Sequence, residues 1–118
     1  HRDGVDGYKF VQEINGKPTA QIMFFNGLSR TARNGEIDYL PNPYIEDNLA
    51  FSFQLQLKAA QYYPGWTRNI YLQSLRYNLH MCPKSLLIES GTQLNTVQEE
   101  RNAMELLADI LNQVLRGE

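Results

Sequence analysis

Glu89 is the residue whose surroundings in the sequence best suit acid–base chemistry. It directly follows Leu86-Leu87-Ile88, a compact apolar run typical of a buried strand, and it precedes the flexible pair Ser90-Gly91. In open α/β sheets, ligands bind at the edge formed by the carboxyl ends of the strands. A glutamate at that edge could serve as a general base whose pKa is set by partial burial. The same pattern also fits a glutamate that faces water where a strand ends.

The two histidines are the other candidates for chemistry. His1 opens the triplet His1-Arg2-Asp3. A neutral imidazole is the commonest metal ligand, and an adjacent carboxylate can orient it. His80 ends a polar loop, residues 76–80, where it could carry a proton or hold a substrate. The alternatives are a mobile terminal histidine and an ordinary loop histidine, and position alone does not choose between them.

The histidines and the cysteine alone are too few for a complete catalytic zinc site, although carboxylates could supply further ligands. Such a site usually has three protein ligands and one open position. The sequence has two histidines, a single cysteine (Cys82) and no His-Glu-x-x-His helix. A serine hydrolase is no better supported, because there is no Gly-x-Ser-x-Gly elbow. Spacing alone therefore proposes no complete active site.

Composition limits the class of protein. The 118 residues suffice for one domain with one core. The formal net charge of -2, without a basic cluster, argues against non-specific nucleic-acid binding. Within these residues no apolar stretch is long enough to span a membrane and none has the pattern of a signal peptide, which leaves the location of a longer parent open. With Cys82 as the only cysteine, an internal disulfide is excluded.

The first third of the chain has the pattern of a hairpin. Residues 8–14 alternate in polarity, and Asn15-Gly16 is the dipeptide preferred in a tight hairpin turn. Residues 19–25 are apolar on both faces, which predicts a strand inside the sheet. Residues 26–42 are polar and form a long loop, a kind of segment that is often functional.

Two helices and two further strands follow. Asn42-Pro43 predicts a helix start with Asn42 as N-cap, and Pro64-Gly65 predicts its end. Strands are expected over residues 70–75 and 85–88, and Thr96 with Glu99 predicts a capping box at the start of the last helix. The expected buried stripes are Ile45, Leu49, Phe53 and Leu57 in the first helix and Met104, Leu107, Ala108, Leu111 and Leu115 in the last. Together these elements predict an α/β fold with a mixed sheet flanked by helices.

Several segments in this order resemble a known family. They are His1-Arg2-Asp3, Ala20-Gln21-Ile22-Met23-Phe24, Asn48-Leu49-Ala50-Phe51, Tyr63-Pro64-Gly65, Arg76-Tyr77-Asn78-Leu79-His80, Ser85-Leu86-Leu87-Ile88-Glu89-Ser90-Gly91 and Asn95-Thr96. The ordered set resembles the C-terminal part of the stage II sporulation protein P family of N-acetylmuramoyl-L-alanine amidases, over nearly the whole chain.

The resemblance implies a fold similar to zinc-dependent cell-wall amidases, with zinc at one edge of the sheet. It implies that residues 1–118 are the C-terminal part of a single catalytic domain, truncated at its N-terminal side. His1 would be a zinc ligand and Glu89 the catalytic glutamate, and the remaining ligands would lie upstream. Positions that bind substrate or support the site would be Arg2, Asp3, Arg76, Asn78 and His80.

The implied reaction is hydrolysis of the amide bond between N-acetylmuramic acid and L-alanine in peptidoglycan. Zinc would lower the pKa of a bound water from about 15.7 toward about 7 and polarise the amide carbonyl. Glu89 would take a proton from that water and return one to the leaving amine. The resemblance also allows endopeptidase action on the stem peptide, and this piece alone is expected to be inactive.

Two other functions stay open at this stage. The chain could be a non-enzymatic module that binds the cell wall or mediates assembly, or another zinc peptidase of related fold. The resemblance implies a location outside the cytoplasm in the cell envelope, a membrane-anchored parent, and sporulation-type membrane proteins as partners. Missing strands would leave an open sheet edge, through which a homodimer could form.

Overall fold

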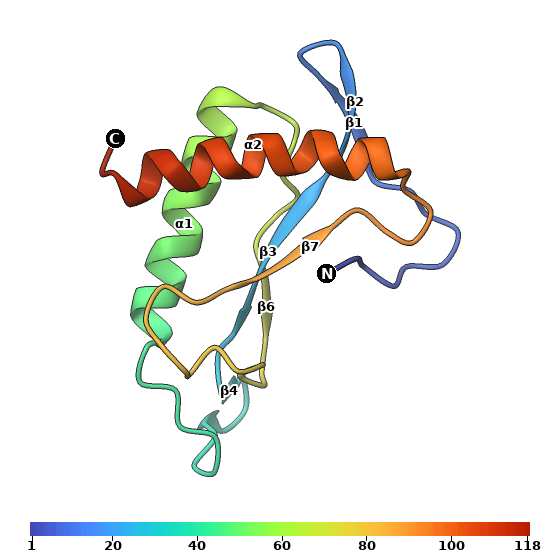
Figure 1. Cartoon of the computed structure of the whole chain (residues 1–118). Helices are drawn as coiled ribbons and strands as arrows, with labels where there is room; N and C mark the ends of the chain where they lie inside the picture. The colour runs from blue at the N-terminus through green and yellow to red at the C-terminus, as the bar shows by residue number, and fades with distance from the viewer.

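The computed structural model describes all 118 residues as an α/β arrangement of seven strands and two helices (Figure 1). In chain order the elements are β1 (Val11–Ile14), β2 (Lys17–Ala20), β3 (Ile22–Gly27), β4 (Arg30–Thr31), β5 (Gly35–Glu36), α1 (Ile45–Tyr62), β6 (Tyr71–Gln73), β7 (Leu87–Ser90) and α2 (Val97–Leu115). The long loop predicted over residues 26–42 contains the small hairpin β4–β5.

The central sheet is mixed, as the sequence predicted. Its strand order is β6-β3-β7, with β3 parallel to β6 and antiparallel to β7. All six residues of β3 are buried, which confirms the inference from its two apolar faces. The β1–β2 hairpin turns through Asn15 and Gly16, whose φ angles of 52° and 78° are those of the predicted tight turn.

The strand predicted over residues 19–25 is wrong in one respect, because Gln21 divides it between two sheets. The Gln21 amide donates to the Phe10 carbonyl, and the Gln21 carbonyl accepts from the Gly91 amide, at 3.0 and 2.9 Å. Its side chain donates to the Gly65 carbonyl at 2.9 Å. Gln21 thus ends the hairpin and lets β3 enter the central sheet.

Both helices pack against the same face of the central sheet (Figure 1). Ile22 and Phe24 of β3 are fully buried on this face. They share one apolar core with Phe51, Leu55 and Ala59 of α1, Ala103 and Ile110 of α2, and Trp66. Trp66 follows the turn that ends α1 and donates its indole N–H to the Ala20 carbonyl at 3.1 Å. Trp66 therefore links the end of α1 to the end of β2.

The predicted start of α1 is wrong by two residues. The helix begins at Ile45, and its N-cap is Tyr44, which makes no side-chain capping bond. The Asn42 side chain instead donates to the Gly27 carbonyl at 3.0 Å and ties the preceding loop to the end of β3. Asn42 therefore bonds to a residue distant in the sequence and does not cap the helix.

The predicted buried stripe of α1 is also wrong. Phe53 and Leu57 are 57% and 54% exposed, whereas the buried face carries the polar residues Asn48 and Ser52 beside the apolar ones. The Asn48 side chain donates to the Leu79 carbonyl at 2.7 Å and accepts from the Ser85 amide at 2.8 Å. Asn48 and Ser52 can be buried because they are hydrogen-bonded inside the protein. A prediction that assumes an entirely apolar stripe therefore identifies the wrong face of α1 as buried.

The last helix begins as predicted, with a complete capping box between Thr96 and Glu99. Leu107 and Leu111 pack against the core, but Met104 and Leu115 of the predicted stripe are exposed. Neither helix is long and apolar enough to cross a membrane.

A hydrogen bond between the end of α1 and α2 gives a first test of this packing. The Tyr63 hydroxyl donates to Asp109 Oδ2 at 2.6 Å, which raises the pKa of Tyr63 to about 12 and lowers that of Asp109. Tyr63→Phe should lower the free energy of unfolding by about 1–2 kcal/mol at pH 7, measured by urea titration. The difference should shrink as the pH falls through the lowered pKa of Asp109.

Tyr62→Phe is the matched control, because the neighbouring ring is half exposed and its hydroxyl has no hydrogen bond to α2. Equal stability of the Tyr63→Phe and Tyr62→Phe variants would contradict the assignment.

Candidate functional site

The N-terminal segment, residues 1–10, begins with a short parallel ladder between residues 1–3 and β7. The His1 amino group donates to the Ile88 carbonyl at 3.1 Å, and the Ser90 amide donates to the His1 carbonyl at 2.7 Å. The Asp3 amide donates to the Gly91 carbonyl at 2.9 Å and Asp3 is bridged to Thr92, so the register shifts by one residue between His1 and Asp3. Because His1 bonds to the residues on both sides of Glu89, His1 is the register partner of Glu89.

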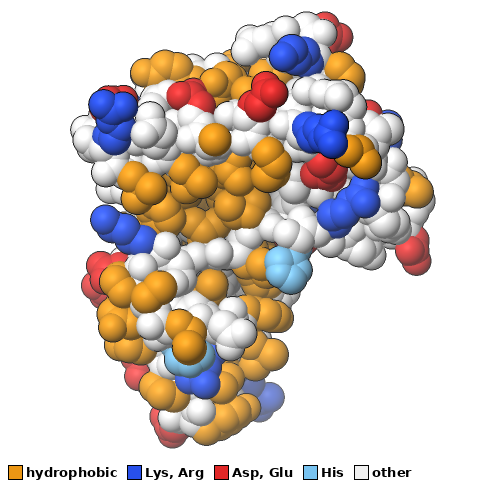
Figure 2. Space-filling model, in the orientation of Figure 1, with side chains coloured by type: hydrophobic (Ala, Val, Ile, Leu, Met, Phe, Trp, Pro, Cys, Tyr) orange, Lys and Arg blue, Asp and Glu red, His pale blue; other side chains and the backbone are white.

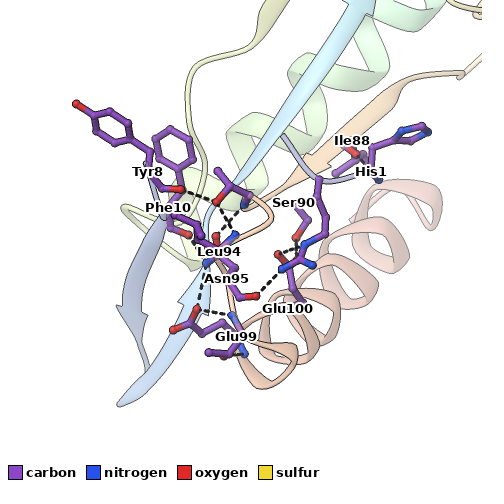
Figure 3. A network of polar contacts seen from close by, with 12 residues as sticks. His1, Tyr8, Phe10, Ile88, Ser90, Leu94, Asn95, Glu99 and Glu100 are labelled. Atoms are coloured by element: carbon purple, nitrogen blue, oxygen red, sulfur yellow. Dashed lines mark hydrogen bonds and ion pairs between the residues drawn. The ribbon is translucent and has the colours of Figure 1, made fainter. Parts of the chain in front are cut away.

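Alternation along the strands assigns each side chain to a face of the sheet. Ser90 and Arg2 turn toward α2: the Ser90 hydroxyl donates to the Glu100 carboxylate, and Arg2 donates to the Asn95 carbonyl. By the same alternation the Glu89 side chain lies on the opposite face, and the His1 imidazole points away from the polar contacts with α2 (Figure 3). The register therefore sets His1 beside Glu89, whose own side chain lies on the face that the helices leave free.

The same face carries two further residues across the sheet. Met23 of β3 is the register partner of Glu89. Ile22 is bridged in parallel to Thr67, and the Arg68 amide donates to the Ile22 carbonyl at 2.7 Å. Continuing this register places Arg68 beside Met23, so that Arg68, Met23, Glu89 and His1 form one row across the sheet.

Glu89 lies inside β7 rather than directly after it, because the strand runs two residues further than the sequence suggested. Burial raises the pKa of its carboxyl group; the amino group of His1 lowers that pKa, Asp3 raises it, and Arg68 lowers it. One carboxyl oxygen, Oε2, is buried without a hydrogen-bond partner. A partly desolvated carboxyl group with a free oxygen is a competent proton acceptor.

Asp3 is held by an arginine that the sequence analysis did not single out. Arg68 Nη1 lies 2.9 Å from Asp3 Oδ2, and both side chains are about three-quarters buried. The Arg68 guanidinium also lies 3.9 Å from the centre of the Phe10 ring. No local pattern marks Arg68, which follows the turn after α1; its role arises from tertiary contacts alone.

Asn95 anchors the N-terminal segment from the other side (Figure 3). Its side-chain amide donates to the Phe10 carbonyl at 2.9 Å and to Glu99 Oε1 at 3.1 Å, while its Oδ1 accepts from the Thr92 amide at 2.8 Å. The Thr92 hydroxyl donates to the Tyr8 carbonyl. One turn between β7 and α2 therefore binds the segment at several points.

Three of the predicted site residues lie elsewhere. Arg76 donates to the Pro41 carbonyl at 3.1 Å, and Asn78 and His80 belong to the same turn, beyond the far end of β3. The two histidines of the chain lie well apart on the surface (Figure 2). The structure thus brings His1, Asp3 and Glu89 together and leaves the roles of Arg76, Asn78 and His80 as predictions.

The donors present do not make a complete metal site. No group of three or more His, Cys, Asp and Glu side chains could hold a metal ion. His1 is the one imidazole beside Glu89, and the carboxylate of Asp3 is already paired with Arg68. Within these 118 residues the arrangement offers a proton acceptor with one candidate metal ligand beside it.

The largest cavity, of about 780 Å³, lies between the N-terminal segment and α2 rather than at Glu89. His1, Arg2 and Ser90 form one wall, and Val97 and Met104 contribute exposed apolar surface from α2. Apolar side chains gather in a hollow beneath this helix in Figure 2. Glu89 lines none of the four principal cavities, because its side chain is on the opposite face.

Gly91 allows the turn after β7 to close. Its φ is +55°, and a Cβ atom there would lie 2.5 Å from Asn95 Oδ1 and 2.6 Å from Glu100 Oε1. Gly91→Ala should therefore lower the free energy of unfolding by about 1–3 kcal/mol. Gly4→Ala, where a Cβ meets nothing within 4 Å, is the control in the same urea titration. Equal effects of the two changes would show that the turn is not constrained as described.

Glu99 should stabilise this region in a pH-dependent way. Burial alone would raise its pKa, but the Lys9 ammonium at 2.8 Å and the hydrogen bonds from Thr96 and Asn95 outweigh burial and lower it. A lowered folded-state pKa gives stability that is present above the usual value of 4.5 and is lost as the pH falls. Glu99→Gln should cost about 1–3 kcal/mol at pH 7 and progressively less below pH ~4.

The control is Glu105→Gln on the exposed face of the same helix, where Lys17 is 4.0 Å away and a cost below about 0.5 kcal/mol is expected. A Glu99→Gln cost that stays constant between pH 7 and pH ~3 would contradict the linkage argument.

Comparison with known proteins gives one match. The family model for stage II sporulation protein P matches residues 1–112. The search of curated proteins and the search of solved structures gave no significant match. The matched range includes the N-terminal ladder, β7, Glu89 and most of α2. The chain therefore belongs to the stage II sporulation protein P family.

Proposed function

We propose that this chain is the C-terminal part of a peptidoglycan amidase domain that cleaves the bond between N-acetylmuramic acid and L-alanine. Membership of the family indicates a sporulation-related cell-wall hydrolase with a role at the cell envelope. The finer assignment rests on one observation: the partly buried carboxyl group of Glu89 lies on the face that the helices leave free, and His1 is the register partner of Glu89.

Glu89 suits the role of general base for three reasons. It belongs to a strand paired on both sides, so that its backbone position is fixed. Its burial raises its pKa from the usual value toward the range in which proton transfer near neutral pH is efficient. Its Oε2 atom has no protein partner and is therefore free to accept a proton from a water or to donate one to a leaving amine.

His1 is the candidate zinc ligand, but the donors in this chain do not by themselves fit a zinc site. The sole cysteine, Cys82, is exposed, and His80 is not beside His1. The remaining ligands would have to come from outside residues 1–118. We therefore assign no catalytic step to the metal and restrict the proposal to the proton transfers of Glu89.

A non-enzymatic role in wall binding or assembly is the alternative, favoured by the incomplete donor set. Metal analysis of the full-length parent after gentle purification separates the two functions. Bound zinc supports the hydrolase, whereas a metal-free protein that binds cell wall without releasing products supports the binding module.

Glu89→Gln in the full-length parent tests the proposed function. Loss of the proton acceptor should reduce hydrolysis of purified cell wall by about 10²–10⁴-fold, because general acid–base catalysis typically contributes this much. Zinc content should stay unchanged, since Glu89 is not assigned as a ligand. Glu105→Gln, an exposed glutamate on α2, should leave activity within about twofold. Near-normal activity of the Glu89 variant would remove this residue from the mechanism.

A further inference from the structure

We propose that Arg68 is the positioning residue of this site: it clamps the N-terminal segment in the register that sets His1 opposite Glu89. The structural part of the proposal stands independently of the enzyme assignment. Its catalytic consequence rests on the proposed function of Glu89.

The backbone of Arg68 is fixed to two separate elements. Its amide donates to the Ile22 carbonyl of β3 at 2.7 Å, and its carbonyl accepts from the Gln56 side chain of α1 at 3.1 Å. The guanidinium therefore projects from a rigid base. From there it contacts two points of the N-terminal segment: Asp3, at 2.9 Å, and Phe10, whose ring centre is 3.9 Å away.

These contacts differ in kind from the exposed ion pairs of the chain. The side chains of Arg68 and Asp3 are 27% and 23% exposed, compared with 51% and 74% for Arg30 and Glu36. Partial burial reduces solvent screening of the charge pair, and the planar guanidinium can both pair with a carboxylate and stack on a ring. An ammonium group provides the charge but not the planar stacking surface, so a lysine should replace Arg68 incompletely.

The contacts of Arg68 act on the first residues of the chain, where pairing with β7 is most prone to fray. Residues 1–3 pair with β7 through three backbone hydrogen bonds, and short terminal segments fray unless they are tied down. Asp3 raises the pKa of Glu89, whereas Arg68 and the N-terminal amino group lower it, so loss of Arg68 would remove one of the two cations that offset the repulsion between these carboxylates. Like charges at short range repel, so the segment would detach from β7 more often.

Hydrogen exchange of the Ser90 amide tests the clamp, because this amide donates to the His1 carbonyl and reports the register directly. Arg68→Gln and Asp3→Asn should each reduce its protection by about tenfold or more relative to amides in the α2 core. The double variant should lose no more than the stronger single variant, since both changes break one interaction. Arg68→Lys should lie between wild type and Arg68→Gln.

Arg30→Gln is the matched control, because it breaks an exposed arginine–glutamate pair far from the ladder and should leave Ser90 protection unchanged. If Arg68→Gln does not fold, Asp3→Asn still tests the clamp with almost no change in side-chain volume. Wild-type protection of Ser90 in the folded Arg68 or Asp3 variants would overturn the proposal.

Wall hydrolysis by the full-length parent separates this inference from the proposed function. Arg68→Gln should lower kcat by about tenfold or more and leave KM within about twofold, because positioning affects the reacting group rather than distant substrate contacts. Arg68→Lys should restore part of kcat. Unchanged kcat in Arg68→Gln, when Glu89→Gln is inactive, would overturn the positioning role. If Ser90 protection falls but Glu89→Gln stays active, the clamp is supported and the proposed function fails.

Discussion

The pairing of the N-terminal segment with β7 is the constraint on which the candidate site depends. Three backbone hydrogen bonds would not hold a terminal segment by themselves, because such segments fray readily. Asn95 holds the segment from the turn before α2, and Arg68 holds it from the opposite edge of the sheet. Arg2 donates to the Asn95 carbonyl and Asp3 pairs with Arg68, so the position of His1 depends on contacts between residues far apart in the sequence.

Side chains alternate between the two faces of this ladder, so residues that bind the α2 region are separated from the residue that could transfer a proton. Arg2 and Ser90 turn toward α2 and join the network that includes Glu100. The Glu89 side chain turns to the other face, and the His1 imidazole points away from these polar contacts (Figure 3). A shift of one residue in the register would exchange the two faces and turn Arg2 away from Asn95 and Glu100. The register therefore decides whether the chain can place an imidazole beside the glutamate.

Sequence patterns predicted the features that local chemistry determines. The Asn15-Gly16 turn, the capping box of Thr96 and Glu99, and the doubly buried β3 all follow from short-range rules, and the structure has each of them. The face of α1 could not be predicted this way, because buried Asn48 is satisfied by partners more than thirty residues away. Arg68 was missed for the same reason: its partners come from distant segments.

The position of Glu89 within a strand bears on its chemistry more than its position in the sequence does. A buried carboxyl oxygen without a hydrogen-bond partner lowers the stability of the fold, and a functional role is one explanation for such an unsatisfied group. A loop would relieve the cost by letting the side chain turn toward water. Inside β7, between β3 and the N-terminal segment, the backbone cannot make that adjustment. The same pairing that raises the pKa of Glu89 by burial therefore also fixes the direction from which a proton can reach it.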